Sequence, residues 1–231
     1  MLCNRIAGIK SKKKIPITNY KAMKLKNALC ALALGLAQAT VLNAAGPVYN
    51  LGSDFSINAG NPNGVWTYGY TTAEGVFTSF PAAEITYDDN GLPVELWVNP
   101  ATRSAIFHNQ NDRNVISNGG EGVHPPDSVW FSSIRPDQLA VAQFTAPVAD
   151  KYHVSAVFTK VLQSVGDKMD VYVFVNQKKV FSGIIKPGKR LRQFTTSVRL
   201  EAGDIISFAA GTAEDGEYGD VVFVEAQIRQ Q

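Results

Sequence analysis

The stretch that decides the fold is Tyr152-His153-Val154-Ser155-Ala156-Val157-Phe158. Its large apolar side chains recur at every second position, so Tyr152, Val154 and Phe158 share one face of an extended chain. His153 and Ser155 lie on the other face. A strand of this kind packs one face in a core and leaves the other in water, as in many antiparallel sheets. The stretch therefore predicts a layered β-structure.

Short apolar or alternating runs recur from here to the C-terminus, and clusters of turn residues separate them. Runs rich in Val, Ile, Thr, Phe and Tyr between Gly, Pro, Asn and Asp are typical of strands. The run 171–175 (VYVFV) is apolar on both faces, so we expect it centrally in a sheet with both faces covered. Strands of this spacing predict a sandwich or a barrel. The clear runs besides 152–158 are 169–175, 179–185, 194–200, 204–209 and 221–228.

The preceding part of the chain is less regular. We expect strands at 55–57, 65–70, 94–98 and 104–107. The longest polar stretch runs from Asn109 to Asp127 and predicts a long loop, a type of segment that is often functional. No internal repeat or linker divides the sequence, so we predict a single domain over residues 46–231.

Residues 1–45 are predicted to be an N-terminal extension and an export signal that is removed. A short basic stretch at 23–27 precedes a nearly continuous apolar run at 28–37, and small residues follow at 37–39 and 43–45. This order is typical of a secretory signal peptide. The apolar run is shorter than the roughly 20 residues of a membrane span. We therefore expect a secreted protein, extracellular or periplasmic, without a membrane span. The residues before Met23 either extend the signal or precede the true start.

Charge changes sign when the leader is set aside. The chain has 22 basic and 20 acidic residues, and eight basic but no acidic residues precede position 40. The remainder carries 14 basic and 20 acidic residues, a net charge of −6. A mildly acidic domain gives no electrostatic reason to expect a nucleic-acid partner. Both cysteines, Cys3 and Cys30, lie in the leader, so we expect no disulfide in the domain.

Three segments carry a resemblance to known proteins: 138–147 (QLAVAQFTAP), 170–176 (DVYVFVN) and 200–208 (LEAGDIISF). They resemble segments of carbohydrate-binding-module-like, or galactose-binding-like, jelly-roll domains. Together with 61–70 (NPNGVWTYGY), they are similar to a group of secreted bacterial proteins, many of which carry a PEP-CTERM sorting tail. The resemblance implies an all-β fold, a two-sheet antiparallel β-sandwich of jelly-roll type. Asp150 departs from the usual Gly, and 228–231 (IRQQ) does not resemble the sorting tail.

Sugar sites combine aromatic faces for stacking with Asn, Asp, Gln or Arg groups for hydroxyls. Trp130 borders the long polar stretch, and that stretch begins with the most polar local cluster in the sequence. Core packing for the aromatic residues and a solvated loop for the polar ones stay open as alternatives. Trp66, Tyr68 and Tyr70 share one face and favour the core. The predicted ligand-binding residues are Trp130, Trp97, His108, Asn109, Asp112 and Arg113.

No catalytic motif is present, and no cofactor is expected, although a structural calcium ion stays open. Asp215, Glu217 and Asp220 lie in an acidic, glycine-containing loop that could supply the oxygen ligands that calcium prefers. The segment 88–91 (DDNG) echoes the start of a calcium loop, but the downstream Glu is missing, so a turn explains it better.

Three functions are compatible with this sequence. The first is a secreted, non-catalytic protein that binds a glycan or polysaccharide. The second is a structural or adhesive protein that binds another protein or itself through an exposed patch or edge strand. The third is a polysaccharide-acting enzyme, which would need two carboxylates flanking a cleft.

Overall fold

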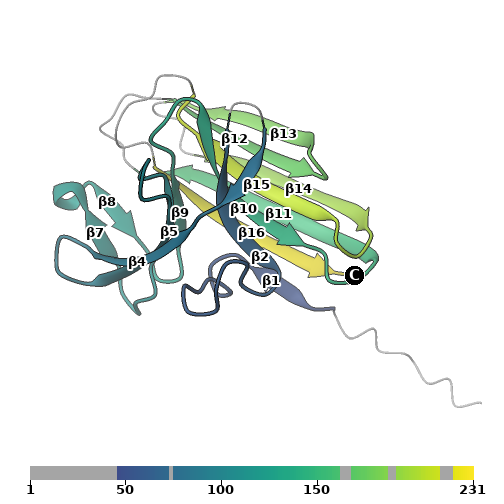
Figure 1. The fold of residues 1–231 in the computed structure, drawn as a ribbon, viewed down its shortest axis with the longest axis horizontal. Helices are drawn as coiled ribbons and strands as arrows, with labels where there is room; N and C mark the ends of the chain where they lie inside the picture. Colours follow the sequence, from purple (N-terminus) through teal and green to yellow (C-terminus); the bar gives the residue numbers. More distant parts are fainter. Residues whose placement is uncertain (1–45, 73–74, 162–167, 187–190, 214–220) are drawn as a thin grey trace, which may run out of the picture. The chain divides into compact units, whose positions relative to one another are not determined.

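The computed structural model describes residues 46–72, 75–161, 168–186, 191–213 and 221–231, and in them the fold is all-β (Figure 1). The leader and Asp215, Glu217 and Asp220 lie outside the described residues. In the first half the strands are β1 (Val48–Asn50), β2 (Trp66–Thr72), β3 (Phe77–Ser79), β4 (Ala82–Tyr87), β5 (Pro93–Val98), β6 (Ala105–His108), β7 (Val115–Ser117) and β8 (Gly122–His124). The others are β9 (Val129–Ser132), β10 (Gln138–Thr145), β11 (Asp150–Lys160), β12 (Met169–Val175), β13 (Lys178–Ile185), β14 (Leu191–Leu200), β15 (Ile205–Gly211) and β16 (Val221–Gln230).

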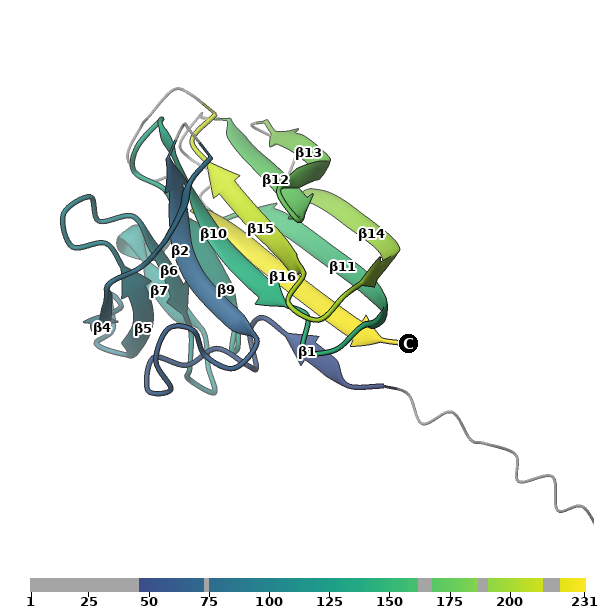
Figure 2. The same cartoon turned by 45° about the vertical axis from the view of Figure 1, so that its right-hand side comes forward.

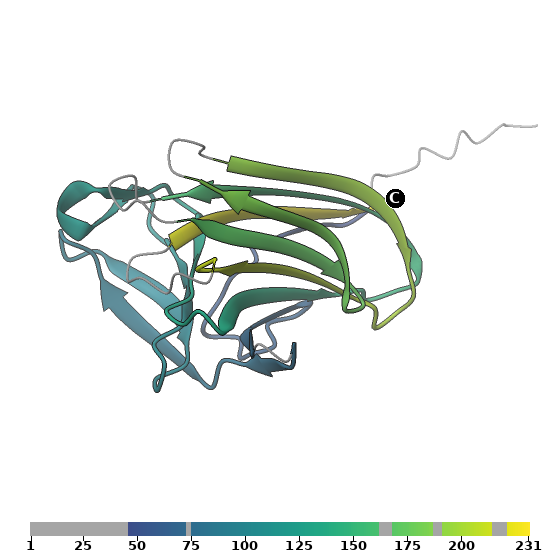
Figure 3. The ribbon, with the colours of Figure 1, turned by 90° about the horizontal axis from the view of Figure 1, so that it is seen from above.

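Two antiparallel sheets form the two layers of a sandwich (Figures 2 and 3). The eight-stranded sheet has the order β14-β11-β16-β9-β6-β5-β4, and β1 also pairs with β16. The six-stranded sheet has the order β13-β12-β15-β10-β2-β3. A small hairpin of β7 and β8 lies beside the eight-stranded sheet (Figure 1). This architecture confirms the two-sheet antiparallel β-sandwich predicted from the sequence.

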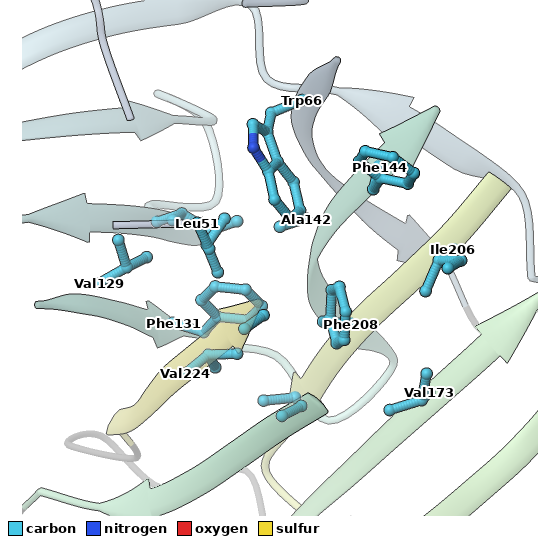
Figure 4. Close-up of a cluster of buried hydrophobic side chains, with 14 of the residues drawn as sticks. Leu51, Trp66, Val129, Phe131, Ala142, Phe144, Val173, Ile206, Phe208 and Val224 are labelled. Atoms are coloured by element: carbon cyan, nitrogen blue, oxygen red, sulfur yellow. The ribbon is translucent and has the colours of Figure 1, made fainter. Parts of the chain in front are cut away.

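The core lies between the two sheets and follows the alternation of the strands. On β11, Tyr152, Val154 and Phe158 are buried, whereas His153 and Ser155 face outward. The opposite sheet contributes large aromatic rings to the same cluster, and Figure 4 shows Trp66, Phe144 and Phe208 together there. Burial of this apolar surface is the main favourable contribution to folding.

The strand β12 departs in part from its prediction. It lies between β13 and β15, as expected for an inner strand. Val171 and Val173 are buried on its inner face, but Tyr172 and Phe174 are only half-buried on the outer face. The outer face of β12 is therefore apolar because two aromatic rings pack beside each other on the sheet surface, not because another layer covers them.

Two other predictions about local structure were wrong. Residues 55–57 form no strand; instead they follow a turn, from which Phe55 is buried in the core and Ile57 packs against it. The segment from Asn109 to Asp127 is not one loop, because it contains β7, β8 and a 3₁₀ turn, Asn118–Gly120. By contrast, the turn predicted at 88–91 is confirmed, since Oδ1 of Asp88 accepts hydrogen bonds from the backbone N–H groups of Asn90 and Leu92 at 2.9 and 2.6 Å.

Candidate ligand-binding site

The outer face of the eight-stranded sheet carries the candidate site, around β11 and β16. The inner face of β16 is buried, whereas Phe223 is half-buried and Glu225 and Gln227 are exposed on the outer face. Antiparallel pairing places Ser155 beside Gln227 and Val157 beside Glu225. Such directly opposed side chains have their Cβ atoms about 4.5–5.5 Å apart. The register therefore gathers polar and apolar groups into one patch.

A cavity of about 450 Å³ lies over this patch. This volume is within the usual range of small-ligand sites. The segment before β9 and the turn after β1 complete its wall. The lining residues are Asn50, Gly52, Pro125, Pro126, Asp127, Ser128, Val129, Ser155, Ala156, Val157, Phe223, Val224, Glu225, Ala226 and Gln227.

Some polar groups of this cavity already form hydrogen bonds within the protein, and others do not. Oδ1 of Asn50 accepts the N–H of Gly52 at 2.9 Å, and the hydroxyl of Ser128 donates to the carbonyl of Pro125 at 2.6 Å. The side chains of Asp127, Glu225 and Gln227 have no hydrogen-bond partner among the described residues, although they line the cavity. The cavity thus offers two carboxylates and an amide to a ligand.

An aromatic cluster behind the cavity supports its apolar wall. The rings of Trp130 and Phe107 stack at 5.4 Å, and His124 lies 4.1 Å from Trp130. Phe223 contacts the edge of this cluster, 5.2 Å from His124. Because Trp130 is only 6 % exposed, it has no free face on which a sugar could stack. Trp130 supports Phe223 from behind. Of the two alternatives left open by the sequence, core packing therefore describes Trp130 better than sugar stacking does.

Trp97 and His108 are also buried, on the inner side of the sheet. The indole N–H of Trp97 donates to the carbonyl of Ser56 at 3.1 Å. Nδ1 of His108 lies 3.4 Å from Oε2 of Glu95, and both side chains are nearly inaccessible. Burial lowers the pKa of His108, although Glu95 opposes this effect. Neither residue lines the cavity.

Asn109 holds the wall of the cavity in place. Its Nδ2 donates to the carbonyls of Arg113 and His124 at 2.9 and 2.8 Å, and the side chain is fully buried. Its backbone N–H donates to Ser128 and its carbonyl accepts from Asp127, both at 3.0 Å. One buried amide therefore connects the start of the β7–β8 segment to the residues that border the cavity.

Replacing Asn109 with Ala should loosen the segment 109–128 and leave the sandwich folded. The substitution removes the hydrogen bonds that Nδ2 donates to the carbonyls of Arg113 and His124, and the two that Oδ1 accepts from Asn111. A buried group left without its partner costs about 1–3 kcal/mol. Amide hydrogen exchange should accelerate in β7 and β8 while β11 stays protected. An Asp112→Ala variant, whose side chain is exposed, serves as the control. Unchanged exchange in β7 and β8 would contradict this role for Asn109.

None of the six residues predicted as ligand-binding lines the cavity. Trp130, Trp97, His108 and Asn109 are buried, as described above. The other two, Asp112 and Arg113, are exposed and form an ion pair with each other at 3.2 Å. The cavity residues Phe223, Glu225 and Gln227 were missed. The alternation in 221–228 indicated that they share one face, but not which strand lies beside it.

No helix in the described residues is long and apolar enough to cross a membrane. Within the same described ranges, no three His, Cys, Asp or Glu side chains gather as a metal site.

Comparison with known proteins gives only distant likenesses. No protein-family model and no curated protein matches the chain. One similar solved structure is the family 51 carbohydrate-binding module from Clostridium perfringens GH95 in complex with methyl-galactose. It is 12 % identical, covers 69 % of this chain and 99 % of its own, and gives a TM-score of 0.34. Another, the family 35 carbohydrate-binding module from Clostridium thermocellum, is 15 % identical. It covers 80 % of this chain and 98 % of its own, with a TM-score of 0.33.

Proposed function

We propose that this protein is a secreted, non-catalytic glycan-binding protein, with its site in the cavity over β11 and β16. The observation that carries the proposal is the cavity itself, where a half-buried ring meets carboxylate and amide side chains that have no hydrogen-bond partner among the described residues. The export signal predicted at 23–45 supports a location outside the cytoplasm. Similarity to proteins with PEP-CTERM tails stays a prediction from the sequence.

The chemistry of the cavity suits a polyhydroxylated ligand. A sugar presents hydroxyl donors, which the carboxylates of Asp127 and Glu225 and the amide oxygen of Gln227 can accept. Its C–H face can pack on the ring of Phe223 and on Val157. A hydrogen bond to a charged group contributes about 1.5–3 kcal/mol, so loss of one should weaken binding by about tenfold or more.

Replacing Glu225 with Ala should weaken glycan binding by about tenfold or more. Replacing Gln227 with Ala should weaken it by less, because this side chain is neutral. Both side chains are exposed, so folding should be unaffected. A glycan array would identify a bound glycan for the unmodified chain, and calorimetry would then measure its affinity for each variant.

The matched control is Glu201→Ala, an exposed carboxylate in the turn before β15. Equal affinities of Glu225→Ala and this control would move the site away from the cavity. Failure of the unmodified chain to bind any glycan would overturn the proposed function.

A polysaccharide-acting enzyme is the second candidate, because Asp127 and Glu225 line the same cavity from different segments. Glycoside hydrolysis requires two such carboxyl groups. This alternative predicts release of reducing ends from a bound glycan. A Glu225→Gln variant would then retain binding and lose turnover, whereas the non-catalytic proposal expects no turnover in either chain.

A further inference from the structure

The strand β4 forms the far edge of the eight-stranded sheet, beyond β5. An edge strand presents unpaired backbone groups, and proteins usually protect such edges with lysine, proline or a very short strand. The edge strand β13 begins with Lys178 and Lys179, and β3 has only three residues. β4, with the sequence AAEITY, has one charge, Glu84, which already pairs with Arg103 at 3.1 Å.

The hydrogen-bonding pattern identifies which backbone groups of β4 are free. The N–H of Asp88 donates to the carbonyl of Leu92 at 2.9 Å, in continuation of the β4–β5 register. Hydrogen-bonded pairs alternate along an antiparallel ladder, so residues 86, 84 and 82 also bond to β5. Pro93, which has no N–H, lies opposite Tyr87 and fits this phase. The N–H and C=O groups of Ala83, Ile85 and Tyr87 therefore point away from β5.

The side chains of the same three residues share one face of the sheet. Ile85 is 53 % exposed and Tyr87 is 68 % exposed, among the most exposed large apolar side chains of the described residues. Free backbone groups and exposed apolar side chains thus coincide at three alternate positions of one strand.

The two-fold axis of an antiparallel pair can pass through a hydrogen-bonded or a non-hydrogen-bonded pair, so any centre from Ala83 to Tyr87 brings outward-pointing groups together. Centring on Glu84 or Thr86 forms two complete hydrogen-bonded pairs, and centring on Glu84 also places like charges opposite each other. Centring on Ala83 would place Pro81, which lacks an N–H, opposite Ile85. Centring on Tyr87 would require the N–H of Asp89, which already donates to Ile116 at 2.9 Å. Centring on Ile85 pairs 85 with 85, 83 with 87 and 87 with 83, and so forms three complete hydrogen-bonded pairs, more than any other centre.

We propose that the chain forms a two-fold symmetric dimer in which β4 pairs antiparallel with β4 of a second copy, centred on Ile85. Ile85 then faces Ile85 of the second copy, and Tyr87 packs over Ala83. About six inter-strand hydrogen bonds form, two for each hydrogen-bonded pair. Glu84 lies opposite Thr86, so no like charges oppose each other, a condition for stable cross-strand pairs.

Replacing Ile85 with Lys should raise the dimer dissociation constant by about tenfold or more, because two cations would meet at the symmetry axis. Sedimentation velocity over a concentration series on the full chain would measure this constant. The control is Val180→Lys on β13, because Val180 is 42 % exposed on a different edge strand. That control should dimerise like the unmodified chain.

A cross-linking experiment gives an independent reading in a chain with Cys3 and Cys30 replaced by Ser. Ile85→Cys should be joined into a covalent dimer by a short bismaleimide, whereas Val180→Cys should not. A chain that stays monomeric at all concentrations would overturn the proposal. A dimer that persists unchanged in the Ile85→Lys variant, or cross-links equally through Val180→Cys, would also overturn it. Glycan binding by a monomer would leave the proposed function intact.

Discussion

Replacing Trp66 with Ala should lower the free energy of unfolding by about 3–5 kcal/mol, a cost typical of large aromatic residues deleted from a core. Trp66 is 1 % exposed and lies 5.7 Å from Phe144 and 6.3 Å from Phe208, measured between ring centroids. Its indole N–H also donates to Oδ2 of Asp54 at 3.2 Å. The substitution therefore removes packing in the middle of the sandwich and one hydrogen bond to the turn after β1.

Urea unfolding followed by circular dichroism would measure the change. Since small domains are stable by only about 5–15 kcal/mol, the midpoint should fall sharply. The neighbouring Thr67→Ala is the matched control, because Thr67 faces outward from the same strand and should change stability by about 0.5 kcal/mol or less. Equal losses for the two variants would contradict the assignment of Trp66 to the centre of the core.

Acidification should destabilise the protein between about pH 6.5 and pH 4 because of His124. Burial lowers the pKa of His124 from 6.5 to about 4. In this window the unfolded chain binds a proton that the folded chain excludes, so stability falls as the pH falls. The slope is up to about 1.4 kcal/mol per pH unit, which corresponds to about 3 kcal/mol over the window. The lowered pKa of His108 acts in the same direction.

A His124→Phe variant isolates the contribution of this residue. Phe keeps the ring beside Trp130, and the half-buried hydroxyl of Ser117, which lies 2.8 Å from Nε2 of His124, can turn to water. The variant should have a flatter dependence of unfolding free energy on pH and should lose less stability at pH 4.5 than the unmodified chain. Parallel curves for the two proteins would show that His124 does not titrate as described.

The strands of the second half could be predicted because each signal is local. The alternation in 152–158 marks a strand with one buried face wherever that strand lies in the fold. The failure at 55–57 has an equally clear reason, since Phe55 is apolar because it anchors a turn in the core. Within 109–127, the hairpin of β7 and β8 was missed because its strands have only three residues each.

The candidate site was harder to predict because it depends on pairing between distant segments. Gln227 and Ser155 lie far apart in the sequence and become neighbours only through the β11–β16 register. Nothing near Phe223 in the sequence indicates that residues 125–128 cover it. Trp130 is a residue type on which sugars often stack, but the β7–β8 hairpin buries it. Residue type alone could not distinguish the buried Trp130 from Phe223, which lines the cavity.

The position of β4 gives the proposed dimer a property that neither copy has alone. β4 and β16 belong to the same sheet, so a continuous sheet built across two β4 strands would carry two cavities, one from each copy. On a polymer with repeated epitopes, occupancy of one cavity would hold the second at a high effective concentration of ligand. Avidity could then exceed the single-site affinity by about 10²–10⁴ without any additional contact.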